Sequence, residues 1–285
     1  MTTFLVEKKI KSPISQPGAK YFLRNKIIES FPEHSSYIEV FGGTGTVLLG
    51  KPKSKIEVFN DINSNIVGFF SVVKDTVKCR SLIDILDFMP YSRRLWKELK
   101  TKWKLGNIPQ DEIQKVAEWF YISRLSFSAD HRNGGFATAS VSTLRNPCVS
   151  FRNIINDLER VSQRLRNVII ECLDFRQVIQ KYDSPGSLFL VDCPYLLDVP
   201  DKSRRYYGHD FSVNDHKELC DMLNDIRGMA VVTHYEHPLY DALYKNWYKY
   251  EFQNFKVSYG LTKQNPNEKK RPKVKEIVYC NFIPE

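Results

Sequence analysis

The stretch Tyr37-Ile38-Glu39-Val40-Phe41-Gly42-Gly43-Thr44-Gly45 decides the fold. Four of its first five residues are apolar or aromatic, which predicts a buried strand, and three glycines among the next four predict a tight turn. An apolar segment continues to Leu49, and a second strand-like run, Ile56 to Phe59, ends at Asn60-Asp61. Strand, glycine turn, helix, strand and acid together predict a βαβ unit.

Asp61 stands where the second predicted strand ends, a position from which a carboxylate can accept both hydroxyls of a ribose. Glycines let the backbone approach such a ligand closely, and the helix that follows offers unpaired N–H groups. Leu48 occupies the third glycine position of the dinucleotide fingerprint, which argues against a pyrophosphate ligand. The pattern fits an adenosine-bearing cofactor, and a tight turn without a ligand stays open as the alternative.

A second motif follows another buried strand. The run Leu188 to Val191 is apolar throughout and leads into Asp192-Cys193-Pro194-Tyr195, at the sheet edge where open α/β sheets bind ligands. These residues suit a planar heterocycle with an exocyclic amine, whose N–H groups can donate to the Asp192 carboxylate and the Cys193 carbonyl. Pro194 would orient that carbonyl, and Tyr195 would stack on the ring. Taken alone, the tetrapeptide also fits a strand-end turn.

Together the two motifs resemble the Phe-x-Gly-x-Gly and Asp-Pro-Pro-Tyr motifs of the DNA adenine methyltransferases, in the group with a target-recognition insert between them. Cys193 replaces the first proline, and the resemblance runs from about Pro17 to Phe282. It implies S-adenosylmethionine as cofactor, double-stranded DNA as partner and a flipped adenine as methyl acceptor. Monomers are common in that family, and the sequence leaves the oligomeric state open. An RNA or protein amide methyltransferase, a nicotinamide oxidoreductase and a catalytically inactive DNA-binding homologue are the alternatives.

The resemblance also implies roles for individual residues. Lys20 ends a segment, Pro17-Gly18-Ala19-Lys20, that is similar to the family's cofactor-contacting lysine segment, and Gln16 stands where the family often has an aromatic residue. The pair Asp174-Phe175 is similar to the pair that frames the cofactor's adenine. The predicted catalytic residues are Asp192, Cys193, Pro194 and Tyr195. The predicted cofactor-binding residues are Gln16, Lys20, Phe41, Gly43, Gly45, Asp61, Asp174, Phe175 and Asp192.

The positive charge of the chain is concentrated in two segments. The net charge is +9, from 42 Lys and Arg against 33 Asp and Glu. Eleven basic residues and five acids lie between Arg93 and Arg152, and six basic residues and one acid lie between Leu261 and Lys275. Because phosphate contacts supply most non-specific affinity, both segments are predicted to contact DNA. The predicted DNA-binding residues are Arg124, Arg132, Asn133, Arg204, Arg205, Lys269, Lys270 and Arg271.

Cysteine and histidine spacing argues against disulfides and metals. The six cysteines lie far apart without a Cys-x-x-Cys pair, which predicts free thiols in a reducing compartment. The resemblance implies that this compartment is the cytoplasm of a bacterium or of a phage-infected host. His234 and His237 flank Glu236, but no third ligand with suitable spacing is visible, so no metal is expected. Cys193 is interpreted as a backbone contributor because its order with Pro194 is not that of a cysteine nucleophile. No membrane span is expected.

The predicted fold class is α/β, a methyltransferase-type Rossmann-like sheet that is mostly parallel, with an antiparallel C-terminal hairpin and a helical DNA-recognition insertion. We expect a catalytic domain at 1–77 and 168–285 and the insertion at 78–167. Helices are predicted at 91–105, 111–127 and 215–226, the last with Ser212 as its cap, and strands at 168–173, 188–191, 229–233, 248–257 and 275–282. The stretch 127–151 is predicted to be a loop or hairpin.

Overall fold

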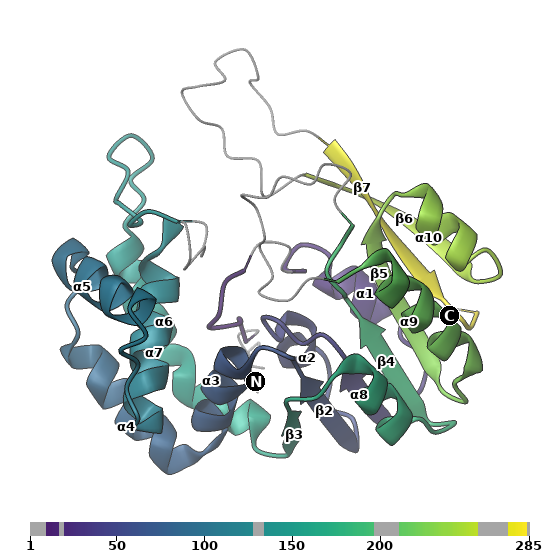
Figure 1. Ribbon diagram of the computed structural model, residues 1–285, viewed down its shortest axis with the longest axis horizontal. Coiled ribbons are helices and arrows are strands. Elements are labelled where there is room, and N and C mark those ends of the chain that lie inside the picture. The colour runs from purple at the N-terminus through teal and green to yellow at the C-terminus, as the bar shows by residue number, and fades with distance from the viewer. Residues whose placement is uncertain (1–9, 17–19, 128–133, 197–210, 256–272, 284–285) are drawn as a thin grey trace, which may run out of the picture.

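The structure of the protein is a computed structural model, and it describes residues 10–16, 20–127, 134–196, 211–255 and 273–283. Within these residues seven strands form one sheet in the order β3-β2-β1-β4-β5-β7-β6 (Figure 1). The strands are β1 (Ser36–Glu39), β2 (Ile56–Asn60), β3 (Val168–Glu171), β4 (Ser187–Val191), β5 (Met229–Tyr235), β6 (Tyr248–Phe255) and β7 (Lys273–Cys280). Strands β1 to β5 pair in parallel, whereas β7 is antiparallel to β5 and β6. The predicted fold class and terminal hairpin are confirmed.

The strand order reverses at β1, which has β2 on one side and β4 on the other. The pairing of β1 with β4 continues to their carboxyl ends, where Val40 N donates to Leu190 O at 3.1 Å. In open α/β sheets a ligand binds at the carboxyl edge where the order reverses. The glycine turn after β1 and Asp192 after β4 therefore begin at adjacent strand ends.

Ten helices accompany the sheet in the described part of the chain. They are α1 (Arg24–Glu29), α2 (Thr46–Gly50), α3 (Ser64–Lys74), α4 (Thr76–Phe88), α5 (Arg93–Lys104), α6 (Glu112–Leu125), α7 (Pro147–Leu165), α8 (Phe175–Tyr182), α9 (Val213–Asp225) and α10 (Pro238–Leu243). As predicted, the Ser212 side chain caps α9 by accepting from the N–H of Asp215. The predicted loop at 127–151 is wrong in its last residues, because α7 already begins at Pro147, with Asn146 as its side-chain cap.

The two faces of the sheet bury separate cores. Leu188 and Leu190 of β4 join the core that α1 to α7 cover, whereas Phe189 and Val191 join the core beneath α8, α9 and α10. Successive side chains of a strand point to opposite faces, and a parallel sheet covered on both faces needs apolar residues at every position. The unbroken apolar run of β4 is explained by this double burial.

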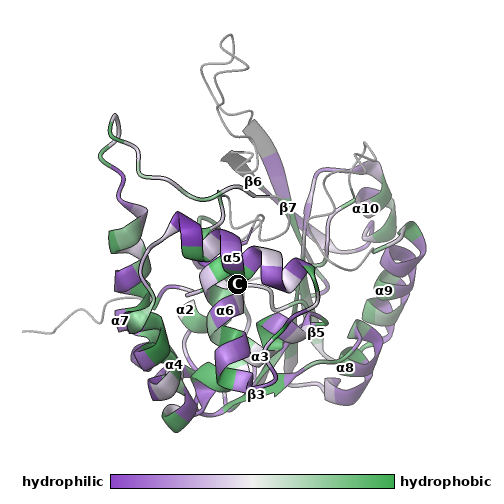
Figure 2. Ribbon diagram, turned by 60° about the vertical axis from the view of Figure 1, so that its left-hand side comes forward, coloured by the Kyte–Doolittle hydropathy of each residue, from purple (hydrophilic) through white to green (hydrophobic). Residues whose placement is uncertain are grey.

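Helices α4 to α7 gather at one end of the molecule, and α3 lies between them and the sheet (Figure 1). Hydrophobic and hydrophilic residues occur along each of these helices (Figure 2), and their apolar side chains share one core with α3. Phe69 of α3 stacks on Phe120 of α6 at a centroid distance of 4.9 Å. The predicted boundaries of the insertion, 78 and 167, stay a prediction. Among the described residues, no helix combines the length and apolar character needed to cross a membrane.

Candidate active site

The glycine turn after β1 has a backbone that only glycine adopts without strain. Gly43 and Gly45 have φ angles of +50° and +61°. A Cβ at Gly42 would lie 2.3 Å from the ring of Phe59, so the backbone there passes too close to β2 for any side chain. A Cβ at Gly43 would lie 3.4 Å from Oε1 of Gln16, so the missing side chain leaves room between the turn and the N-terminal segment.

Asp61 reaches this turn from the end of β2. Its Oδ2 accepts from the N–H of Gly43 at 2.7 Å, and its Oδ1 accepts from the N–H of Asn63 at 2.8 Å. The buried side chain of Asn60 fixes the neighbouring strand ends, because its Nδ2 donates to Val40 O at 2.9 Å and its Oδ1 accepts from Leu173 N at 2.8 Å. The turn and the predicted ribose acid are thus brought together, and Asn60 is a positioning residue that our sequence analysis missed.

Three aromatic rings meet beside the turn. Phe41 lies 5.9 Å from Phe175 and 5.5 Å from Phe211, centroid to centroid. Asp174 is the N-cap of helix α8, because its carboxylate accepts from the N–H of Arg176 at 3.0 Å, and it also pairs with the guanidinium of Arg176 at 3.1 Å. Phe41 and Phe175, two of the predicted cofactor-binding residues, therefore lie side by side. The contacts of Asp174 are those of a helix cap.

Asp192 lies at the centre of a polar cluster at the end of β4. Its Oδ1 is 2.6 Å from Nζ of Lys20 and accepts from the Thr233 hydroxyl at 2.9 Å. Lys20 also pairs with Glu276 of β7 at 3.2 Å, and the Tyr195 hydroxyl donates to the same Glu276 oxygen at 3.0 Å. The structure therefore brings three predicted residues together with two that sequence reasoning missed.

Charge and burial oppose each other in this cluster. Burial raises the pKa of Asp192 above its ordinary value, and the Lys20 ammonium beside it offsets part of that rise. Lys20 is itself buried, and its Nζ lies 4.8 Å from the centroid of the Tyr195 ring. Lys20 thus links the N-terminal segment to both the carboxylate and the aromatic ring of the second motif.

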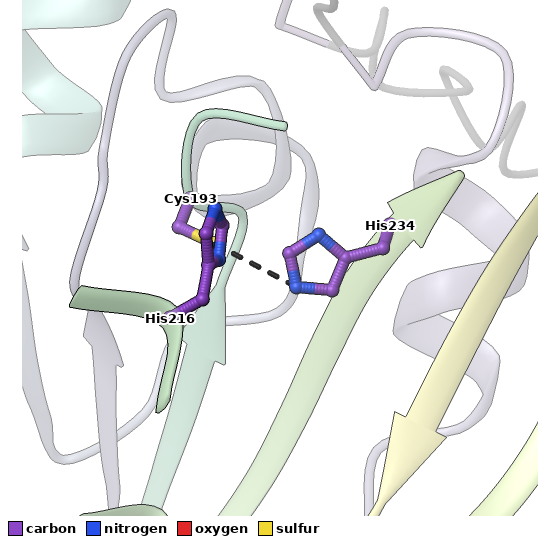
Figure 3. Close-up of side chains that lie close together, drawn as sticks. All are labelled: Cys193, His216 and His234. Atoms are coloured by element: carbon purple, nitrogen blue, oxygen red, sulfur yellow. Dashed lines mark hydrogen bonds between the residues drawn. The ribbon is translucent and has the colours of Figure 1, made fainter. Parts of the chain in front are cut away.

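Cys193 points away from this cluster into the core beneath α9. Its Sγ lies 3.7 Å from Nδ1 of His216 and 3.7 Å from Nε2 of His234 (Figure 3). Burial raises the pKa of Cys193 well above its ordinary value and lowers the pKa of His216 to about 4. His237 lies outside this group and caps α10 by accepting from Leu239 N at 3.1 Å. The sequence offered no third ligand at suitable spacing for His234 and His237, and it did not reveal this other group, because spacing along the sequence does not report a cluster gathered from three elements.

The predicted DNA-binding residues lie largely outside the described residues. Arg124 is described: its guanidinium donates to the Ser15 hydroxyl at 2.7 Å, and burial lowers its pKa to about 10. It therefore reaches the N-terminal segment next to Gln16, and its predicted DNA contact stays a prediction. The residues outside the described ranges are Arg132, Asn133, Arg204, Arg205, Lys269, Lys270 and Arg271.

Glu39, at the end of β1, is a buried carboxyl group to which our sequence analysis gave no role. Its Oε1 accepts from the Tyr37 hydroxyl at 2.8 Å and from Leu48 N at 2.6 Å, whereas its Oε2 has no partner among the described residues. Burial raises its pKa to about 7. The folded protein thus holds a proton on Glu39 at pH values where the unfolded chain has released it.

We expect Glu39→Gln to flatten the pH dependence of stability. Between about pH 4.5 and about pH 7 the folded state binds more protons than the unfolded state, so wild-type stability falls as pH rises, by about 3 kcal/mol from this group. Glutamine keeps the acceptor at Oε1 and does not titrate. Urea unfolding of both proteins across this range measures the difference, and parallel curves would refute the assignment.

The sequence comparisons all match enzymes of one kind. Residues 17–264 match the model of the D12 class N6 adenine-specific DNA methyltransferases. The chain is 23% identical to the type II methyltransferase M.MjaIII of Methanocaldococcus jannaschii, over 96% of this chain and 100% of that protein. It is 22% identical to a DNA adenine methylase of Vibrio cholerae, over 79% of this chain and 81% of that protein. It is 23% identical to the DNA N-6-adenine-methyltransferase of Escherichia phage P1, over 75% of this chain and 28% of that protein.

Proposed function

Because the chain belongs to the D12 class N6 adenine-specific DNA methyltransferases, we propose that its sheet edge at Asp192 transfers the methyl group of S-adenosylmethionine to a flipped adenine of duplex DNA. The protein is an N6-adenine-specific DNA methyltransferase, and family membership implies S-adenosylmethionine dependence. One observation carries the assignment of residues: the Asp192 carboxylate, held by Lys20 and Thr233, follows the strand adjacent to the glycine turn.

The glycine turn and its neighbours fit the cofactor. The space between Gly43 and Gln16, which a Cβ would fill, suits a ligand that passes close to the backbone. Asp61 would accept from the ribose hydroxyls, and Phe41 and Phe175 would flank the adenine ring. S-adenosylmethionine, when bound, supplies an electrophilic methyl group. These residues would hold it at the carboxyl edge, toward the end of β4.

Asp192 would bind the adenine amine. Lys20 and Thr233 both contact Oδ1, and Oδ2 is the carboxylate oxygen that would accept an amine N–H. The Cys193 carbonyl would accept the second N–H, and Tyr195, whose hydroxyl is fixed by Glu276, would stack on the ring at about 1–3 kcal/mol. Two acceptors favour a pyramidal nitrogen whose lone pair points at the methyl carbon.

The transfer would be an in-line displacement that needs no covalent enzyme intermediate. S-adenosylmethionine, held by Asp61, Phe41 and Phe175, would supply the methyl group to the amine nitrogen and leave as a neutral thioether. The amine would pass one proton to water, so that atoms and charge balance. The task of the chain is to hold the two reactants in line and to satisfy the amine N–H groups.

DNA binding would rest on the basic segments and on the insertion at 78–167, which we propose as the target-recognition region. Neutralising Lys269, Lys270 and Arg271 to glutamine is expected to weaken duplex binding and lower its salt slope by up to about 3, because each lost phosphate contact removes about 0.9. The control neutralises Lys53, Lys55 and Arg166, three exposed residues that precede β2 and β3 and so lie at the opposite edge of the sheet. Binding isotherms at several salt concentrations measure both slopes, and equal slopes would contradict the assignment.

The activity is tested by expressing the full chain in a host without adenine methylation. Nucleoside mass spectrometry of digested genomic DNA should then reveal N6-methyladenine. Purified protein with labelled S-adenosylmethionine should label duplex DNA and leave RNA and protein unlabelled. If the soluble protein leaves no methyladenine in DNA, or labels RNA instead, the proposed reaction is wrong.

A further inference from the structure

Three side chains of types that can bind metal ions lie close together behind the motif 192–195. Cys193 comes from the loop after β4, His216 from α9 and His234 from β5 (Figure 3). All three are buried, with exposed fractions of 2%, 1% and 0%. We propose that they form a site for a divalent transition metal ion of the Zn²⁺ type.

The two sulfur-to-nitrogen distances are close to those of a tetrahedral site. Zinc binds thiolate sulfur at about 2.3 Å and imidazole nitrogen at about 2.0 Å, so sulfur and nitrogen on one ion lie about 3.6 Å apart. Sγ of Cys193 lies 3.7 Å from a nitrogen of each histidine, and all three atoms lie within 4.8 Å of one another. Two imidazole nitrogens on one zinc lie about 3.3 Å apart, so closing the site would bring the two imidazoles together by up to about 1.5 Å.

The donor set is also right for such an ion. One thiolate and two neutral imidazoles form a mixed sulfur and nitrogen set that zinc prefers over hard oxygen sites. Nε2 of His216 lies 3.4 Å from the Tyr240 hydroxyl, a partner for the ring N–H when Nδ1 binds a metal. The Tyr240 ring stacks on His234 at 3.5 Å between centroids, with planes 5° apart, which fixes that imidazole. The thiol would lose its proton to solvent as the ion binds.

The position of the site ties it to the rest of the molecule. Asp192 and Cys193 are consecutive and point to opposite sides of the sheet, as do Thr233 and His234 of the adjacent strand. A metal on the Cys193 side would therefore clamp the peptide that carries Asp192 to β5 and α9. No fourth His, Cys, Asp or Glu atom joins the group among the described residues, so water would complete the coordination.

The experiment uses the full chain, stripped with a chelator and reloaded with Zn²⁺ or Co²⁺. After gel filtration we expect one zinc per chain by mass spectrometry. The cobalt form should show a thiolate charge-transfer band and the intense visible bands of tetrahedral Co²⁺. Zinc should also raise the free energy of unfolding, because it binds the folded state.

Variants of individual histidines test whether zinc binds at the proposed ligands and not at another histidine. His216→Gln and His234→Gln should lose the zinc, the thiolate band and the stabilisation by zinc. His237→Asn should keep all three, because His237 lies outside the cluster and asparagine also caps helices. A wild type that retains no more zinc than His234→Gln, or a cobalt spectrum without a thiolate band, would overturn the proposal. If both glutamine variants fail to fold, the wild-type cobalt spectrum alone decides. Metal content does not depend on methyl transfer, so this test stands apart from that of the proposed function.

Discussion

Asp192→Ala is expected to lower methyl transfer by about 10³-fold or more while leaving S-adenosylmethionine binding measurable. The substitution removes Oδ2, the oxygen that would accept from the adenine amine, whereas the glycine turn and Asp61 keep their mutual contact at 2.7 Å. The loss should therefore appear in the rate of the chemical step. Single-turnover transfer of a labelled methyl group to duplex DNA measures that rate, and calorimetry measures the cofactor affinity.

Two further variants give this prediction its controls. Asp192→Asn keeps the size of the side chain but replaces one carboxylate oxygen by an amide donor, so it should also be inactive. Asp84→Ala removes an exposed carboxylate of α4 and should retain wild-type activity. Activity in Asp192→Ala within about tenfold of wild type would refute the catalytic assignment. An equal loss of cofactor affinity would instead assign Asp192 to cofactor binding.

Arg164→Ala is expected to destabilise the fold by about 3–5 kcal/mol. Arg164 of α7 is buried, and its guanidinium donates to both oxygens of Glu57 on β2, at 2.5 and 2.8 Å, and to Leu48 O at 2.6 Å. Burial raises the pKa of Glu57, but the hydrogen bonds from Arg164 and Lys51 hold it below its ordinary value. The alanine variant would leave a buried carboxylate whose one remaining cationic partner among the described residues is Lys51.

The control for this prediction is Arg166→Ala, which removes an exposed arginine two positions further on. It should change stability by no more than about 0.5 kcal/mol. Urea unfolding of the three proteins gives the free energies of unfolding. Similar losses in both variants would mean that the ion pair with Glu57 does not tie α7 to the sheet.

Local sequence patterns were sufficient to predict the first βαβ unit and the edge on which the site lies. Gly42, Gly43 and Gly45 predict a turn because glycine adopts the backbone angles that the turn needs. The apolar run before Asp192 predicts a strand that is buried on both faces. Ser212 was recognisable as a cap because capping depends on residues three positions apart. Each of these signals is complete within a few residues, so a single sequence carries it.

The rest of the polar cluster depends on pairings that local patterns do not contain. Glu276 reaches Tyr195 only because β7 inserts antiparallel beside β5, with Glu276 opposite Tyr235. Cys193 meets His216 and His234 across 23 and 41 positions of the chain. Thr233 was within reach of sequence reasoning, since it lies near the carboxyl end of the strand adjacent to β4. The contacts of Glu276, His216 and His234 could be predicted only after the pairing of the strands was known.

The pairings of β1 with β4 and of β5 with β7 also determine when the cluster around Asp192 can form during synthesis. Ser35 and Gly186, hydrogen-bonded at the start of this pair, are 151 positions apart. Closing so long a loop costs chain entropy before any contact compensates for it, and parallel pairing of this kind is slow. Glu276 joins the cluster only after β7 has left the ribosome. A nascent chain can therefore bury the α3 to α7 core before the cluster around Asp192 is complete.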